Sequence, residues 1–149
     1  LVQRGASTLA EAYFTGSDRP SGDWFARSVA FTADHPHDLR SISKSVTGLV
    51  AGIVHGRGQL DLQQPVLDSF PELADLSTPE RRQITVQHLL DMSAGVQFDE
   101  DDYDDPNSDG VLIEQVSGYV PHRGGAVPTD TAAWILSLPA QGTHGDRFQ

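Results

Sequence analysis

The stretch that decides the fold is LRSISKSVTGLVAGIVH, which spans residues 39–55. Its apolar residues recur every three or four positions, a spacing that places one apolar stripe along an α-helix. The stripe consists of Ile42, Val46, Leu49, Val50, Ile53 and Val54. Because an apolar stripe of this length needs a partner surface, we expect the first five of these residues to be among the most buried in the protein.

Ser41 and Lys44 lie at the polar start of this helix. Residues three apart are neighbours on a helix surface, so the two side chains should lie side by side on the first turn. A serine oxygen at a helix start is close to free backbone N–H groups and to the positive end of the helix dipole, which would stabilise developing negative charge. The spacing therefore predicts the S-x-x-K arrangement of acyl-transfer enzymes, with Ser41 as nucleophile and Lys44 as base.

Lys44 is the only lysine among ten Lys and Arg residues. Arginine cannot give up its proton, whereas lysine can when its pKa falls. Lysine ordinarily has a pKa of about 10.4 and would need one of roughly 7–8 to act at neutral pH, which burial and neighbouring positive groups can bring about. The alternative is a solvated helix start, with Ser41 as a cap and Lys44 exposed.

The motif lies within a longer stretch of family-like sequence. The run HDLRSISKSVTGLVAGIVHGRGQLDLQQPVLDSFPEL (37–73), followed by ITVQHLLDMSAGV (84–96), resembles the serine β-lactamase-related superfamily of class C β-lactamases, D,D-peptidases and esterases. The segments FDEDDYDDPNSDG (98–110) and QGTHGDRFQ (141–149) most resemble its 6-aminohexanoate-dimer (nylon oligomer) hydrolase branch. The resemblance runs from about Thr8 to the end of the chain.

The resemblance implies an α/β (α+β) fold of the β-lactamase/D,D-peptidase type, incomplete here, with a helical region and the first strands of an antiparallel sheet. Residues 1–149 would be the N-terminal part of one catalytic domain, with strands and a lead-in loop in 1–38 and mostly helices with long loops in 39–149. The start at Leu1 rather than Met also leads us to interpret the chain as a fragment.

The resemblance also implies functional residues besides Ser41 and Lys44. Members of the family use a tyrosine and a K-T-G-like or H-x-G-like triad, and we expect that tyrosine just beyond Gln149. The fragment alone should then be inactive. An ungapped match to the nylon-oligomer branch places Tyr103, Glu114 and Tyr119 along the substrate cleft. The implied function is hydrolysis of an amide, ester or lactam through an acyl-serine intermediate.

Composition narrows the range of partners. A formal net charge of −11 argues against nucleic acid or an anionic membrane surface as a partner. The sequence has no cysteine and no apolar run long enough to span a membrane, so we expect neither thiolate metal sites nor a membrane span. We expect a small-molecule substrate and no cofactor. The sequence indicates neither a localisation nor an oligomeric state.

Local patterns predict the remaining elements. We expect a strand over 8–14, a turn cluster over 16–22, and a second strand or extended segment over 24–31. Short helices are predicted near 66–70, over 86–92 with Val86, Leu89 and Leu90 inward, over one or two turns within 111–116, and over 130–138. Thr85 and Asp130 stand at the starts of two of these helices, where capping residues are preferred.

The acidic tract offers a competing function. Residues 105–110 read DPNSDG and match the first half of a calcium-binding loop, although position twelve of that loop is Val116 rather than a chelating Glu. The alternative to a hydrolase is thus a non-catalytic binding module, including a calcium loop over 105–116. His35 and His37 form a pair without an evident third ligand, and we interpret them as loop residues.

Overall fold

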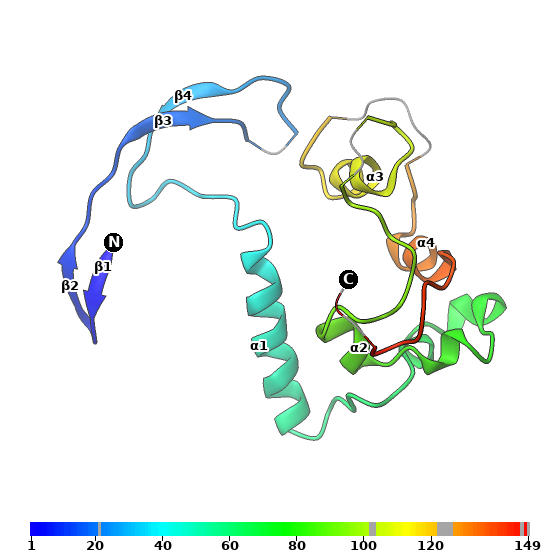
Figure 1. Ribbon diagram of the computed structural model, residues 1–149. Coiled ribbons are helices and arrows are strands. Elements are labelled where there is room, and N and C mark those ends of the chain that lie inside the picture. The colour runs from blue at the N-terminus through cyan, green and yellow to red at the C-terminus, as the bar shows by residue number, and fades with distance from the viewer. Residues whose placement is uncertain (21, 102–103, 122–126, 147, 149) are drawn as a thin grey trace.

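Strands occupy the start of the chain, and helices follow in the remainder. The computed structural model describes residues 1–20, 22–101, 104–121, 127–146 and 148. Helices and small antiparallel sheets together agree with the predicted α/β (α+β) class. Figure 1 shows two strand hairpins on one side, the long helix α1 in the middle and the shorter helices on the other side. No helix of the described residues is long and apolar enough to cross a membrane.

Two antiparallel hairpins form the strand region. Strand β1 (Val2–Arg4) pairs with β2 (Ser7–Ala10), and β3 (Thr15–Asp18) pairs with β4 (Arg27–Ala30). The prediction of β4 is confirmed, but β3 lies where a turn was predicted. A Cβ atom on Gly16 would lie 3.3 Å from the ring of Phe31, so this glycine marks a close packing contact within a strand rather than a turn.

Helix α1 (Ile42–Gly56) confirms the helix predicted from the apolar periodicity. It ends where Gly58 takes a positive φ of 70° and donates its N–H to the carbonyl of His55 at 2.8 Å. Glycine adopts this left-handed conformation without a steric penalty, which explains why the helix stops there. The imidazole Nδ1 of His55 lies 2.8 Å from the carbonyl oxygen of Leu60 and fixes the chain that leaves the helix.

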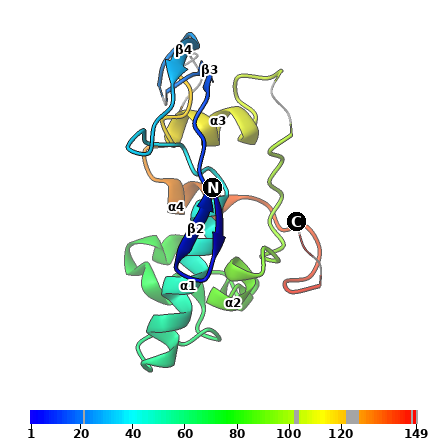
Figure 2. The ribbon, with the colours of Figure 1, turned by 90° about the vertical axis from the view of Figure 1, so that its left-hand side faces the viewer.

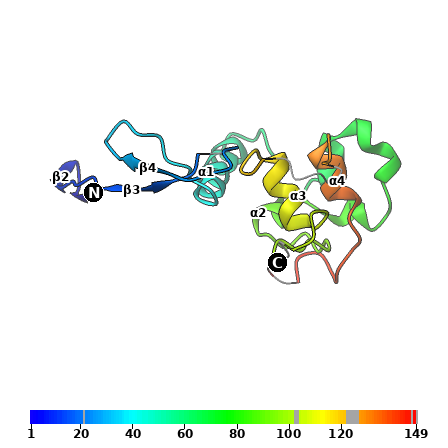
Figure 3. The ribbon, with the colours of Figure 1, turned by 90° about the horizontal axis from the view of Figure 1, so that it is seen from above.

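The expected burial of the α1 stripe is wrong. Its residues are between 48% and 66% exposed: Ile42, Val46, Leu49, Val50 and Ile53. The physical reason is that α1 packs closely on none of the other helices and strands in the described part of the chain. Seen from above, α1 stands between the strand hairpins and the remaining helices (Figure 3).

The hydrophobic core lies instead among the short helices. It is formed by Val66, Leu67, Ile84 and Leu136, with Phe70, Leu73, Leu76, Ala94 and Val96 packed against it. These residues come from or adjoin the 3₁₀ helices η1 (Val66–Ser69), η2 (Pro71–Leu76) and η3 (Arg81–Gln83) and the α-helices α2 (Val86–Leu90) and α4 (Thr131–Ser137). None of the core residues belongs to α1, so the core does not form around this helix. In Figure 2, which views the molecule from the side of β1 and β2, this hairpin lies in front of α1.

Side-chain caps begin the short helices. Thr85 and His88 form a capping box at the start of α2, and Asp130 accepts a hydrogen bond from the Ala133 N–H at the start of α4, as the sequence predicted. Leu89 and Leu90 are exposed, however, against the expectation that they point inward. Leu89 borders a cavity that opens beside Lys44, so the inner face of α2 is left partly uncovered.

Candidate active site

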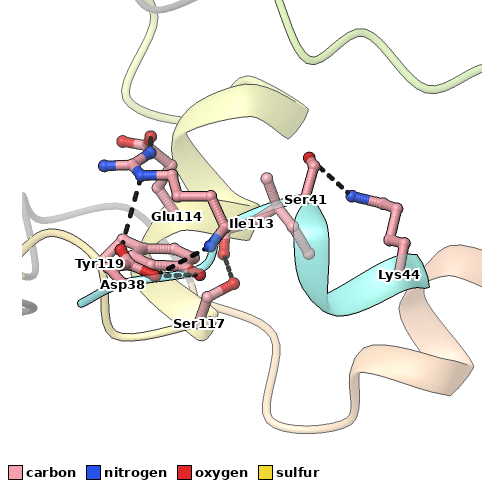
Figure 4. Close-up of polar contacts among 8 residues, drawn as sticks. Asp38, Ser41, Lys44, Ile113, Glu114, Ser117 and Tyr119 are labelled. Atoms are coloured by element: carbon pink, nitrogen blue, oxygen red, sulfur yellow. Dashed lines mark hydrogen bonds and ion pairs between the residues drawn. The ribbon is translucent and has the colours of Figure 1, made fainter. Parts of the chain in front are cut away.

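Ser41 and Lys44 are in direct contact at the start of α1. Ser41 is the N-cap residue, and the Lys44 Nζ donates a hydrogen bond to its Oγ at 3.2 Å (Figure 4). This confirms the predicted placement of the two side chains on one helix turn. The alternative of a solvated helix start agrees with the exposure of Lys44, but the Ser41 side chain makes no capping hydrogen bond. Its oxygen is instead paired with an amine, as a nucleophile paired with a base would be.

The backbone around Ser41 leaves one donor available. The N–H groups of residues 42, 43 and 44 each donate to the carbonyl three residues earlier, at 3.0 Å. Among the described residues, none accepts a hydrogen bond from the Ser41 N–H. This free N–H lies at the positive end of the α1 dipole, where an anion is stabilised.

Lys44 is exposed. No carboxylate oxygen of the described residues lies within 4.0 Å of its Nζ, the distance limit for an ion pair. Its one hydrogen-bonding partner there is Ser41 Oγ. An ion pair would favour the protonated ammonium form of a lysine. The amine of Lys44 is thus directed at the serine and is not held by an acidic side chain.

Two cavities meet at this pair. A polar cavity of about 310 Å³ is bordered by Ser41 and Lys44 and by the carboxylates of Glu100, Asp101 and Glu114. An apolar cavity of about 320 Å³ also borders Lys44, with a wall formed by Leu89, Met92, Phe98, Ile113 and Ile135. Each volume is at the lower end of the range for small-molecule sites. The Ser41–Lys44 pair can therefore meet a ligand that has both a polar and an apolar part.

Arg40, directly before Ser41, has a left-handed backbone with φ of 45°. A non-glycine residue in this conformation costs about 1–3 kcal/mol and persists only when its surroundings hold it. The guanidinium lies 3.5 Å from Asp38, 3.4 Å from Glu114 and 4.7 Å from the centre of the Tyr119 ring. Figure 4 shows Asp38, Glu114 and Tyr119 gathered beside the start of α1.

Tyr119 is held by Asp38. Its hydroxyl donates a hydrogen bond to Asp38 Oδ1 at 3.1 Å. This hydrogen bond, followed by desolvation and by the nearby Asp38 charge, raises the pKa of the Tyr119 hydroxyl, while the positive charge of Arg40 opposes the shift. Tyr119 therefore remains a hydrogen-bond donor throughout the neutral pH range.

The sequence-predicted cleft residues are partly brought together. Glu114, on α3 (Asp109–Val116), and Tyr119 both border the polar cavity beside Ser41. Tyr103 lies outside the described residues. Sequence reasoning missed Asp38 and Arg40, although both closely precede Ser41, because their contacts with Glu114 and Tyr119 join positions 74 and 81 residues apart. It also missed the apolar wall beside Lys44, which comes from four separate segments.

The calcium-loop alternative does not fit the observed backbone. Helix α3 occupies residues 109–116, where an EF-hand loop needs an extended ligand-bearing segment. Asp105 Oδ1 accepts hydrogen bonds from the Asn107 N–H and amide, and Ser108 caps α3. His35 and His37 pack around Phe31, and His35 lies 3.7 Å from Asp18. No group of three or more potential metal ligands occurs in the part of the chain that is described.

Two comparisons relate the chain to known proteins. A family model described as Beta-lactamase matches residues 1–149. A curated protein from Paenarthrobacter ureafaciens, 6-aminohexanoate-dimer hydrolase, is 33% identical over 146 residues. The alignment covers 98% of this chain and 32% of that hydrolase, so the chain spans about a third of the length of the relative it matches.

Proposed function

The chain belongs to the β-lactamase family, and from that premise we propose that it supplies Ser41 as the nucleophile and Lys44 as its base to a serine hydrolase, without being active by itself. The substrate would be an amide, an ester or a lactam. One observation carries the proposal: the Lys44 Nζ lies 3.2 Å from Ser41 Oγ at a helix start where no described residue accepts a hydrogen bond from the serine N–H.

The proposed chemistry follows from these atoms. Lys44 in its neutral form takes the proton of Ser41 while Oγ attacks the substrate carbonyl carbon. The Ser41 N–H donates to the oxyanion that forms and supplies one half of an oxyanion hole. As the C–N or C–O bond of the tetrahedral intermediate breaks, the proton taken up by Lys44 passes to the leaving nitrogen or oxygen, and an amine or alcohol departs. Water then hydrolyses the acyl-serine, which releases the acid and restores the serine.

The two cavities favour a substrate of mixed polarity. The apolar wall that includes Leu89, Phe98 and Ile135 suits a methylene chain, and the carboxylates of the other cavity suit a polar or cationic group. The relative is named as a hydrolase of 6-aminohexanoate dimer, an amide. We therefore propose amides of short linear amino acids as the first substrates to test.

Covalent labelling tests the assignment of the nucleophile. The protein in its longest natural form is treated with a fluorophosphonate probe, and the modified peptide is identified by mass spectrometry. We expect the adduct on Ser41, with no labelling of the Ser41→Ala variant. Ser43→Ala is the matched control, because this neighbouring serine on the same helix should be dispensable for labelling.

The role of the lysine is tested separately. Lys44→Arg keeps the positive charge but cannot accept the serine proton. Loss of a general base typically costs about 10²–10⁴ in rate, so both Lys44→Arg and Lys44→Met should slow acylation and turnover to that extent. Labelling of the Ser41→Ala variant at the same rate would refute the nucleophile, and full activity of Lys44→Arg would refute the base.

A further inference from the structure

The left-handed backbone of Arg40 directly precedes the proposed nucleophile and has a set of partners of its own. We propose that Asp38, Glu114 and Tyr119 form a clamp that holds Arg40 in this conformation and thereby orients Ser41 toward the cavity. The inference rests on the proposed function, since it assigns Arg40 as a positioning residue for that serine.

The contacts of the clamp reach both the backbone and the side chain of Arg40. Asp38 Oδ1 accepts a hydrogen bond from the Arg40 N–H at 3.1 Å, and its other oxygen lies 3.5 Å from Nε. Glu114 approaches the far end of the guanidinium at 3.4 Å, and the ring of Tyr119 lies beneath it. Tyr119 also donates to Asp38, so the three partners form one connected network.

The network matters because α1 has few packing contacts that could fix its position. Exposed ion pairs such as these contribute little individually, whereas several joined in one network can fix a local geometry. Since α1 packs closely on no other described helix or strand, the Arg40–Glu114 contact ties the chain directly before its first turn to α3. A change at Glu114 should therefore reach Ser41 through Arg40.

The φ and ψ angles of Arg40 together set the direction of the peptide group that carries the Ser41 N–H. The carbonyl oxygen of Arg40 accepts a hydrogen bond from the Ser43 N–H at 3.0 Å, and this bond fixes the first turn of α1. Relaxation of Arg40 to a negative φ would turn the free N–H and Oγ of Ser41 away from their present directions. A displacement of about 1 Å in a reacting group can cost on the order of 100-fold in rate.

Two substitutions at position 40 separate a backbone role from a side-chain role. Glycine adopts a positive φ without strain, whereas alanine does not. In the longest natural protein, we expect Arg40→Ala to slow the reaction of Ser41 with the fluorophosphonate, in which Oγ bonds to phosphorus and fluoride leaves, by about tenfold or more. Ser41 of the Arg40→Gly variant should react with the probe several-fold faster than Ser41 of Arg40→Ala. The matched control is Arg57→Ala, an arginine at the opposite end of α1, which should acylate like the unmodified protein.

A double-mutant cycle tests whether Glu114 acts through Arg40. We expect Glu114→Gln to slow acylation on its own but to add nothing in the Arg40→Ala background. If Glu114 contacts substrate directly, its substitution will raise KM equally in both backgrounds. That result, or equal acylation rates for Arg40→Gly and Arg40→Ala, would overturn the clamp.

Amide hydrogen exchange provides a readout that is independent of activity. We expect the N–H groups of residues 42–44 to exchange faster in Arg40→Ala and in Glu114→Gln, with melting temperatures showing that the variants remain folded. Unchanged exchange in both variants would refute the clamp even if acylation changed. Absence of a Ser41 adduct in the unmodified protein would refute the proposed function alone, because the exchange measurement would still decide the clamp.

Discussion

The hydroxyl of Tyr119 should titrate at a higher pH than an ordinary tyrosine, because Asp38 accepts its proton in a hydrogen bond. The raised pKa means that the folded state favours the neutral phenol. This contribution to stability is present below the unfolded pKa of about 10 and is lost as the pH rises through the folded value.

Ultraviolet difference titration at high pH measures this shift. The unmodified protein minus Tyr119→Phe gives the titration of Tyr119 separately from the other two tyrosines. We expect a midpoint above 10 that moves downward in Asp38→Asn, because the charged acceptor is lost. A midpoint that is unchanged by Asp38→Asn would contradict the hydrogen bond as its cause.

The sequence was informative about single residues only where the decisive contacts are local. Ser41 and Lys44 are three positions apart, so helix geometry alone brings their side chains together. Arg40 is different, because nothing in the residue type indicates a positive φ, and two of its three partners come from the distant positions 114 and 119. A strained conformation held by distant partners is not visible in a local pattern.

At the scale of elements, the capping box of α2 should contribute measurably to stability. Thr85 Oγ1 accepts from the His88 N–H, and the His88 ring accepts from the Thr85 N–H. We expect Thr85→Ala to lower the free energy of unfolding of the 149-residue chain by about 1 kcal/mol, as for other N-caps. Urea denaturation measures it. Thr32→Ala, at an exposed loop position, should change little, and an equal loss in both variants would contradict a capping effect.

The contrast between α1 and the core gives a second prediction for the 149-residue chain. Ile84 is 1% exposed, so Ile84→Ala should cost about 2–5 kcal/mol through lost burial and an unfilled cavity. Leu49, on the exposed stripe, is 66% exposed, and Leu49→Ala should stay within about 0.5 kcal/mol. Denaturant melts of both variants test this pair, and a large loss for Leu49→Ala would show that the stripe is covered in solution.

Elements were predicted better than their packing. The apolar period of α1 and the cap residues Thr85 and Asp130 are local signals, and the helices lie where these signals placed them. Periodicity identifies which face of α1 is apolar but not what covers it. Strand β3 was missed because Gly16 was interpreted as a turn residue. In the structure this glycine packs against the ring of Phe31, a contact that turn propensities do not predict.

At the scale of the whole molecule, the chain exposes more surface than its mass requires. Its accessible surface is 10268 Å² for 16.1 kDa. A compact protein of that mass exposes about 7,400 Å². The hairpins and α1 lie apart from the core in Figures 1 and 3, which accounts for the excess. The sequence resemblance identified the family, which the family model confirms, but it could not reveal this distribution of surface.

The exposed stripe of α1 also has a calorimetric consequence. Unfolding a protein raises its heat capacity because apolar groups become hydrated, by about 12–15 cal/mol/K per residue. The stripe of α1 is already hydrated in the folded chain, and the surface newly exposed on unfolding is about a fifth smaller than for a compact protein of this mass. Scanning calorimetry of the 149-residue chain should therefore give a heat-capacity increment lower by roughly that fraction and independent of protein concentration. An increment of ordinary size that grows with concentration would mean that copies of the chain shield one another's stripe from water.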